Sequence, residues 1–240
     1  MHKWIPNQHG AWAMLIAPIV AMMLSVGPTL LQLVLLIGWL SAYCFNYFVG
    51  LVAKSWRRAD RWKKYQDQLI GYGSIALIAG AVLVSAEPKL LFLAPILLLV
   101  FVVNIAAIKL GEERNWINDV LGIALSIVIG GVAGFIVSGE ISQNNWKILA
   151  SHAIYFIGTV WYVKTNIREK GKRSWRALSV GWHTLATVYG FLVAPALGCF
   201  FVLTTVRSLV VPNLNWKPKQ VGMLEILFTI SLLIIGYVVL

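Results

Sequence analysis

The chain has few charged residues for its length. Of its 240 residues, only 12% are charged and 59% are hydrophobic, and the mean hydropathy is +0.78. A soluble domain carries about a quarter charged residues, so this composition argues against a water-soluble fold. Acidic residues are the scarcer sign, with nine Asp and Glu against 20 Lys and Arg. Because the basic residues cluster between long apolar runs, the net charge of +11 indicates membrane topology and not nucleic-acid binding.

Motifs that carry known chemistry are also absent from the sequence. The two cysteines, Cys44 and Cys199, both lie in apolar runs and show no CxxC or zinc-type spacing. There is no glycine-rich phosphate loop, HExxH or GxSxG motif. No pair of carboxylates stands at helical spacing inside an apolar run, which argues against a hydrolase and against an ion-coupled transporter. We predict no metal site.

Apolar runs long enough to form membrane-spanning helices dominate the chain. A helix needs about 20 apolar residues to cross a bilayer. The nine predicted spans are 10–26, 29–52, 69–86, 90–108, 120–138, 148–163, 177–193, 196–211 and 221–240. The stretch 177–211 is broken only at Pro195 and Gly198, so it forms either two short crossing helices or a re-entrant hairpin.

The distribution of basic residues predicts the orientation of these spans. With the N-terminus in the cytoplasm and nine crossings, inside segments hold 18 of the 20 Lys and Arg residues. The outside segments hold only Lys89 and Lys147. Cytoplasmic loops are enriched in positive charge. We therefore predict one transmembrane domain, residues 1–240, of an all-α polytopic membrane protein with nine transmembrane helices, N-in and C-out.

Polar residues gather at the predicted cytoplasmic ends of the spans. Ionisable groups inside a membrane are costly and are therefore functional candidates. The candidates for proton transfer are Asp119, Glu169 and His9. The candidates for binding an anionic ligand are Asn7, Gln8, Asn46, Lys54, Arg114, Asn118, Lys164, Arg168, His183, Arg207 and Glu225. Within one bundle, these groups would line a cavity that opens to the cytoplasm.

Each candidate also has a structural interpretation. The loop Lys and Arg residues hold the topology, and Arg207 and Glu225 form an ion pair or extend toward the interface. Asp119 caps a helix N-terminus. His152, at the predicted outer end of the sixth span, is an interfacial histidine, and the GxxxG-type spacing in 130–134 serves close helix packing.

Four short patches resemble the YwiC-like family of bacterial membrane proteins. They are Ile5-Pro6-Asn7-Gln8-His9-Gly10-Ala11-Trp12-Ala13-Met14 followed by Pro18, Glu113-Arg114-x-x-x-Asn118-Asp119, Ile167-Arg168-Glu169-Lys170-Gly171, and Lys217-Pro218-Lys219-Gln220-Val221-Gly222. The patches cover both ends and two inner loops, so the likeness spans the chain. It implies a location in the bacterial cell membrane.

The layout more distantly resembles the UbiA-type intramembrane prenyltransferases, which implies a UbiA-like helical bundle. In those enzymes, acidic residues four apart, after the second and sixth helices, hold Mg²⁺ and the isoprenyl diphosphate. The corresponding positions here read Asn46-x3-Gly50-x3-Lys54 and Lys164-x3-Arg168-x3-Lys172. The metal-binding acids are missing, so we predict no cofactor, and the substitutions argue against Mg²⁺. Arg and Lys could instead bind an anionic head group directly.

Three functional hypotheses follow. In the first, the protein binds an amphipathic anionic ligand, isoprenoid or lipid-like, at a cytoplasm-facing cavity, as a divergent UbiA-like protein with or without transferase activity. In the second, it transports or exports a small anion, which requires polar groups that reach the outer half of the bundle. In the third, it is a non-catalytic membrane assembly partner whose basic loops meet anionic lipid or an acidic protein. All three place it in contact with the lipid bilayer.

Overall fold

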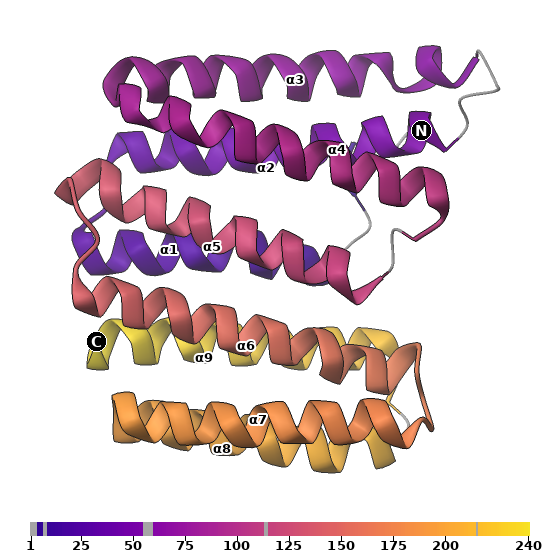
Figure 1. The fold of residues 1–240 in the computed structure, drawn as a ribbon, viewed down its shortest axis with the longest axis vertical. Helices are drawn as coiled ribbons and strands as arrows, with labels where there is room; N and C mark the ends of the chain where they lie inside the picture. The colour runs from indigo at the N-terminus through magenta and orange to yellow at the C-terminus, as the bar shows by residue number, and fades with distance from the viewer. Residues whose placement is uncertain (1–3, 7–8, 55–59, 113–114, 215) are drawn as a thin grey trace. The chain divides into compact units, whose positions relative to one another are not determined.

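The described part of the protein is helical throughout and contains no strand. The computed structural model describes residues 4–6, 9–54, 60–112, 115–214 and 216–240. Its elements are α1 (His9–Val26), α2 (Leu30–Ala53), α3 (Asp60–Ala86), the 3₁₀ helix η1 (Pro88–Leu93), α4 (Ala94–Leu110), α5 (Trp116–Ser138), α6 (Gln143–Ile167), α7 (Arg173–Val193), α8 (Pro195–Val210), the 3₁₀ helix η2 (Val211–Asn213) and α9 (Pro218–Val239) (Figure 1).

Each predicted span coincides with one of these α-helices, but several helices extend further than the apolar run. The third helix begins at Asp60 and not at residue 69, and the sixth begins at Gln143 and not at residue 148. At the start of α6, the Ser142 hydroxyl accepts a hydrogen bond from the Asn145 backbone N–H at 3.2 Å. Hydropathy marks only the apolar part of a helix, whereas capping residues set its ends.

Six described segments are long and apolar enough to cross a membrane. They are Leu30–Ala53, Trp62–Ala86, Pro88–Leu110, Trp116–Ser138, Pro195–Asn213 and Pro218–Val239. The other three predicted spans correspond to α1, α6 and α7. The apolar segment described for α1 is the short Ala11–Val26. More than half of α6 is buried by other helices, so its polar residues contact protein and need not meet lipid.

The stretch 177–211 forms a helical hairpin. The break falls at Ala194, which is extended with φ −164° and ψ 142°, and Pro195 begins α8. Proline fits the first turn of a helix because its missing N–H would have no intrahelical partner there. The predicted second breaker, Gly198, lies inside α8. A side chain there would meet the Phe191 ring, so Gly198 serves the packing of α7 against α8.

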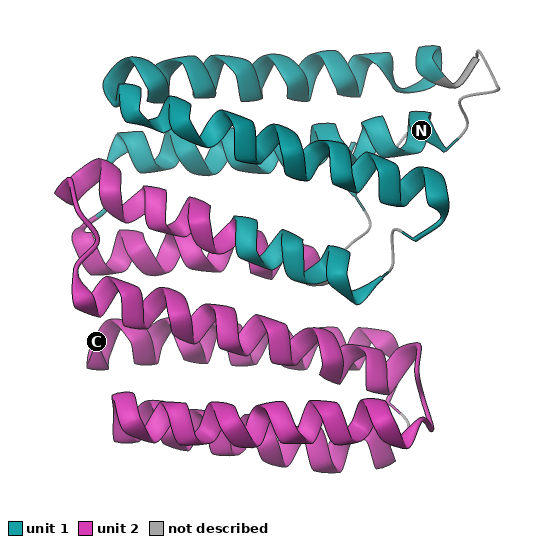
Figure 2. Ribbon diagram, in the orientation of Figure 1, with its two compact units in different colours: residues 1–8, 28–125 teal, residues 9–27, 126–240 magenta. Residues whose placement is uncertain are grey.

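The chain divides into two compact units (Figure 2). Unit 1 comprises residues 1–8 and 28–125, and unit 2 comprises residues 9–27 and 126–240, so the boundary falls within α5. In unit 1, α2 packs against both α3 and α4. Small residues allow these contacts: a Cβ on Gly38 would lie 2.7 Å from the Ala79 Cβ.

In unit 2, α6 contacts α1, α7 and α9, and α8 packs on α7 and α9. The glycine spacing in 130–134 serves close packing, as predicted. A Cβ on Gly130 would lie 2.7 Å from the Pro18 Cβ of α1 and 3.1 Å from Leu149 Cδ2 of α6. Such small residues let helix backbones approach closely in membrane proteins.

Candidate functional site

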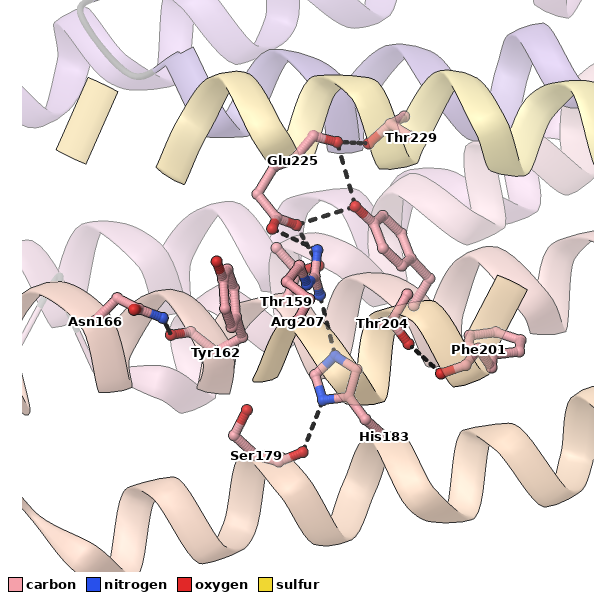
Figure 3. A network of polar contacts seen from close by, with 11 residues as sticks. Thr159, Tyr162, Asn166, Ser179, His183, Phe201, Thr204, Arg207, Glu225 and Thr229 are labelled. Atoms are coloured by element: carbon pink, nitrogen blue, oxygen red, sulfur yellow. Dashed lines mark hydrogen bonds and ion pairs between the residues drawn. The ribbon is translucent and has the colours of Figure 1, made fainter. Parts of the chain in front are cut away.

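A buried ion pair between Arg207 of α8 and Glu225 of α9 forms the centre of the polar network in unit 2 (Figure 3). The two residues are only 4% and 6% exposed. One Glu225 oxygen, Oε1, pairs with Arg207 Nη1. The other, Oε2, accepts hydrogen bonds from the hydroxyls of Tyr155 at 3.0 Å and Thr159 at 2.8 Å, both on α6. Both carboxylate oxygens therefore have partners, as a buried charge requires.

His183 of α7 completes the network on the other side of the guanidinium. Its Nδ1 lies 2.7 Å from the Ser179 carbonyl oxygen, and its Nε2 lies 3.1 Å from Arg207 Nη2. A carbonyl oxygen can only accept, so Nδ1 carries the proton. Arginine can only donate, so Nε2 accepts. Both contacts are satisfied by the neutral imidazole with its proton on Nδ1.

Aromatic rings enclose the guanidinium. The Arg207 Cζ lies 4.2 Å from the centroid of the Tyr162 ring and 4.7 Å from that of Phe228, distances at which cation–π attraction operates. The Nε of Arg207 and the hydroxyl of Tyr162 are buried and have no hydrogen-bond partner among the described residues. The Arg207 Nε–H and the Tyr162 O–H are thus hydrogen-bond donors without an acceptor in the part of the chain that the structure describes.

The local sequence explains how α6 and α7 position their side chains around the ion pair. On α6, Tyr155, Thr159 and Tyr162 are four and three residues apart, so they share one face. On α7, Ser179 and His183 are also four apart. Gly158 lets His183 approach α6, because a Cβ at that position would lie 3.0 Å from His183 Nε2.

Hydroxyl groups continue from this site along α6, α7 and α8. One turn beyond His183, the Thr187 hydroxyl lies 3.0 Å from that of Thr205. Further along α7, the Tyr189 hydroxyl lies 3.3 Å from that of Ser151. Polar side chains therefore extend from the ion pair toward the hairpin turn of unit 2.

Unit 1 contains a separate chain of three asparagines. The Asn46 amide of α2 donates to Asn104 Oδ1 of α4 at 3.2 Å, and the Asn104 amide donates to Asn118 Oδ1 of α5 at 3.1 Å. The Asn46 Oδ1 atom is buried and has no hydrogen-bond partner among the residues that the structure describes. Hydrogen bonds between asparagine side chains thus connect α2, α4 and the start of α5 in unit 1.

An open depression of about 310 Å³ lies at the ends of α1, α5, α6 and α9 in unit 2. It is lined by Ser25, Val26, Ser138, Glu140, Ser142, Asn144, Asn145 and Leu240. None of the predicted site residues lines it.

The structure brings some of the predicted residues together. His183, Arg207 and Glu225 meet in unit 2, and Asn46 and Asn118 meet in unit 1 through Asn104. The structural interpretation of Arg207 and Glu225 as an ion pair is confirmed.

The predicted residues near helix ends occupy different settings. Lys164 is buried in the last turn of α6, whereas Lys54 and Arg168 are exposed at the C-caps of α2 and α6. Glu169 forms a surface ion pair with Lys172 at 2.6 Å.

Asp119 lies in the first turn of α5. The Asn115 side chain accepts from the Ile117 backbone N–H at 3.1 Å and takes the capping role. The predicted positions Asn7, Gln8 and Arg114 lie outside the described residues, as does the side chain of His9.

His152 is deeper in the protein than its predicted interfacial position. Because α6 begins at Gln143, His152 lies about 14 Å along the helix at 1.5 Å per residue. It is 1% exposed, and its Nδ1 lies 2.9 Å from the Ile148 carbonyl oxygen. Its Nε2 has no hydrogen-bond partner within the described part of the chain.

Sequence reasoning missed the residues that support the ion pair: Tyr155, Thr159, Tyr162 and Phe228. A signal was available, because the three α6 residues recur at helical spacing in a predicted span. No group of three or more His, Cys, Asp or Glu that could hold a metal ion occurs among the described residues. The arrangement is suited to holding an anion beside Arg207 and to proton exchange at His183.

Comparison with known proteins identifies the family. Residues 5–134 match the family described as "YwiC-like protein". The chain is 30% identical over 227 residues, covering 94% of itself and 93% of the relative, to a Bacillus subtilis (strain 168) protein described as "Uncharacterized protein YwiC". It is also 30% identical over 239 residues, covering 95% of each chain, to an "Uncharacterized protein" of Haemophilus influenzae (strain ATCC 51907 / DSM 11121 / KW20 / Rd). No solved structure matches. The chain therefore belongs to the YwiC-like protein family.

Proposed function

We propose that this protein is a multi-pass protein of the bacterial cell membrane, N-in and C-out, that binds an amphipathic anion with its head group at Arg207. The observation that carries the proposal is the buried guanidinium, whose Nε has no hydrogen-bond partner in the described part of the chain. A cation in such a setting is costly, and in membrane segments it marks a candidate functional site. Binding needs no metal, because arginine itself pairs with carboxylate, phosphate or sulfonate oxygens.

Glu225 acts in this proposal as the resident counter-ion that a ligand replaces or joins. Its Oε2 is held by Tyr155 and Thr159, so the carboxylate keeps two hydrogen bonds when Arg207 turns to a ligand. Exposed apolar residues on the same helices, Val206 on α8 and Leu227 on α9, offer surface to the hydrocarbon tail. The head group and tail would thus be bound by different groups.

Decane-1-sulfonate is a suitable probe, because it is a single-charged oxyanion with a hydrocarbon tail. We expect the protein in nanodiscs to bind it in a calorimetric titration and to bind decan-1-ol at least tenfold more weakly. Glu225→Gln should bind the sulfonate about tenfold more tightly, a gain of about 1.4 kcal/mol, since it removes the buried negative charge that neutralises Arg207 and repels a second anion.

The matched control is Glu169→Gln, which makes the same chemical change in the exposed pair with Lys172. It should bind as the wild type does. The double variant Arg207→Gln/Glu225→Gln removes both buried charges together, so it leaves no unpaired ion and should lose sulfonate binding. Equal binding of decanol and decanesulfonate, or unchanged binding by the double variant, would overturn the proposal.

The row of hydroxyls supports a second candidate, transport of a small anion. Thr187, Thr205, Ser151 and Tyr189 extend the polar path away from Arg207, which a site at one mouth of the bundle does not need. Methanesulfonate distinguishes the two candidates in the same titration. Binding as tight as that of decanesulfonate favours the small anion, and binding at least tenfold weaker favours the amphipathic one.

A further inference from the structure

We infer that binding of an anion at Arg207 is coupled to uptake of one proton by His183, an inference that rests on the proposed function. The coupling follows from the guanidinium edge that is not fully hydrogen-bonded and from the two contacts of the imidazole. No covalent step is involved, and the proton comes from water.

The edge of Arg207 with unused hydrogen-bonding capacity is the one that carries Nε–H and Nη2–H. These two donors point in the same direction in a planar guanidinium and match two oxygens of a carboxylate, phosphate or sulfonate. Among the described residues, Nε has no hydrogen-bond partner, and Nη2 donates to His183 Nε2. Glu225 binds the other nitrogen, Nη1, so an oxyanion can take this edge while the ion pair persists.

An oxyanion bound to this edge changes the hydrogen bond that His183 Nε2 must make, from accepting to donating. An oxygen bound to Nη2–H lies beside His183 Nε2, which carries a lone pair in the present network. Two acceptors then face each other, so Nε2 must gain a proton to donate to the anion. Moving the existing proton from Nδ1 does not solve this, because Nδ1 would then turn a lone pair toward the Ser179 carbonyl oxygen 2.7 Å away. Only the imidazolium donates to both oxygens.

The charges around His183 lead to the same conclusion. The titratable groups of the surrounding network are Arg207 on α8, Glu225 on α9, and Tyr155 and Tyr162 on α6. Arg207 and Glu225 are neutral as a pair, so a bound monoanion leaves one uncompensated negative charge in a buried site. An imidazolium at His183 restores neutrality, and unpaired charges are costly in such surroundings.

The experiment measures protons and ligand together. Decane-1-sulfonate and methanesulfonate are titrated into the protein in nanodiscs by calorimetry in two buffers of different ionisation enthalpy. Sulfonates do not titrate near neutral pH, so any proton taken up belongs to the protein. We expect one proton per sulfonate bound, and an affinity that rises up to tenfold for each unit by which the pH falls. The two probes show whether a tailed or a small anion drives the uptake.

His183→Gln is the test variant, because its amide can donate and accept but cannot gain a proton. It should bind sulfonate with no proton uptake and with an affinity that does not vary with pH. His152→Gln is the control, since His152 is equally buried but its ring contacts the Ile148 carbonyl. It should keep the uptake of one proton.

The outcomes separate the two proposals. If the wild type binds neither sulfonate, the proposed function fails. If it binds sulfonate without proton uptake, or if His183→Gln still takes up a proton, the coupling is overturned while the ligand site stands. Should His183→Gln fail to fold, the proton count of the wild type in the two buffers still decides whether uptake occurs, and an unchanged count in His152→Gln excludes the other fully buried histidine as the group that gains the proton.

Discussion

Among single residues, Gly158 is the one on which the geometry of the buried network depends most directly. Its position on α6 faces the α7 side chains. A Cβ there would lie 2.8 Å from Trp182 Cδ1 and 3.0 Å from His183 Nε2. Trp182 is fixed in turn, because its indole N–H donates to the Ile154 carbonyl oxygen at 2.9 Å. A single methyl group would therefore displace either the helix or the imidazole that contacts Arg207.

We expect Gly158→Ala to lower the free energy of unfolding in detergent by about 1–3 kcal/mol, the usual cost of overpacking a well-packed core. Gly181→Ala is the matched control, since it is also helical and a Cβ there meets nothing within 4 Å. It should be neutral or slightly stabilising, by up to about 1 kcal/mol. Thermal unfolding midpoints of the two variants check this. Equal midpoints would contradict the packing seen here.

The sequence singled out the charged residues of the site but not their partners. Arg207, Glu225 and His183 were predicted because ionisable groups are rare in apolar runs. Tyr155 and Thr159 were not, because a hydroxyl in a helix usually bonds its own backbone or faces the interface. Which side chains meet a carboxylate from another helix is decided by tertiary packing, and the local sequence does not contain that information.

Among the helices, the α7–α8 hairpin shows how small residues set an interhelical contact. A Cβ on Gly190 would lie 2.8 Å from Phe201 Cδ2 and 2.9 Å from the Gly198 Cα. The ring of Phe191 occupies the space over Gly198. The two helices therefore meet backbone to backbone beside their turn, as small residues permit in membranes.

We expect Gly198→Ala to separate α7 from α8 near the turn and to destabilise the protein more than an ordinary glycine substitution does. Gly222→Ala in α9 is the control, because a Cβ there meets nothing within 4 Å. The comparison is the thermal unfolding midpoint in detergent, where only Gly198→Ala should fall by several degrees. A fall of the same size in both variants would show that the hairpin contact is not specific.

The sequence predicted which segments are helical far better than where they begin or why they break. All nine apolar runs correspond to helices, because the period and length of such runs are strong signals. The extra turns of α3 and α6 are polar, so hydropathy could not find them. The sequence predicts a break at Gly198, but glycine in a helix is equally a packing residue, and only contact with the neighbouring helix decides between the two roles.

For the whole molecule, the division of basic residues makes a prediction about orientation. The arrangement N-in and C-out places 18 of 20 Lys and Arg in the cytoplasm. Six described segments have the length and apolarity to cross, and the α7–α8 hairpin determines how the chain reaches α9. A hairpin that crosses twice and one that re-enters from the cytoplasm both leave the C-terminus outside, so a reporter at the C-terminus cannot distinguish them.

The location of the turn between α7 and α8, at Ala194, distinguishes a hairpin that crosses twice from one that re-enters. Arg176, near the start of α7, donates to Asn213 Oδ1 at 3.0 Å and to the Leu209 carbonyl oxygen at 2.9 Å, so the basic end of α7 lies beside the end of α8. The predicted N-in orientation puts that basic end in the cytoplasm, and Pro195–Asn213 is long and apolar enough to cross. The turn at Ala194 should therefore reach the outer surface.

We expect Leu192→Cys, at a position 83% exposed in the structure, to react with a membrane-impermeant maleimide added to intact cells. The background is Cys44→Ser/Cys199→Ser, which removes the other thiols. Lys89→Cys should also react from outside, and Lys170→Cys only after the membrane is opened. A Leu192→Cys thiol that reacts in neither condition would show a re-entrant hairpin. Arg207 would then lie in a segment that does not cross, and a path for a small anion between α7 and α8 would lose its outer end.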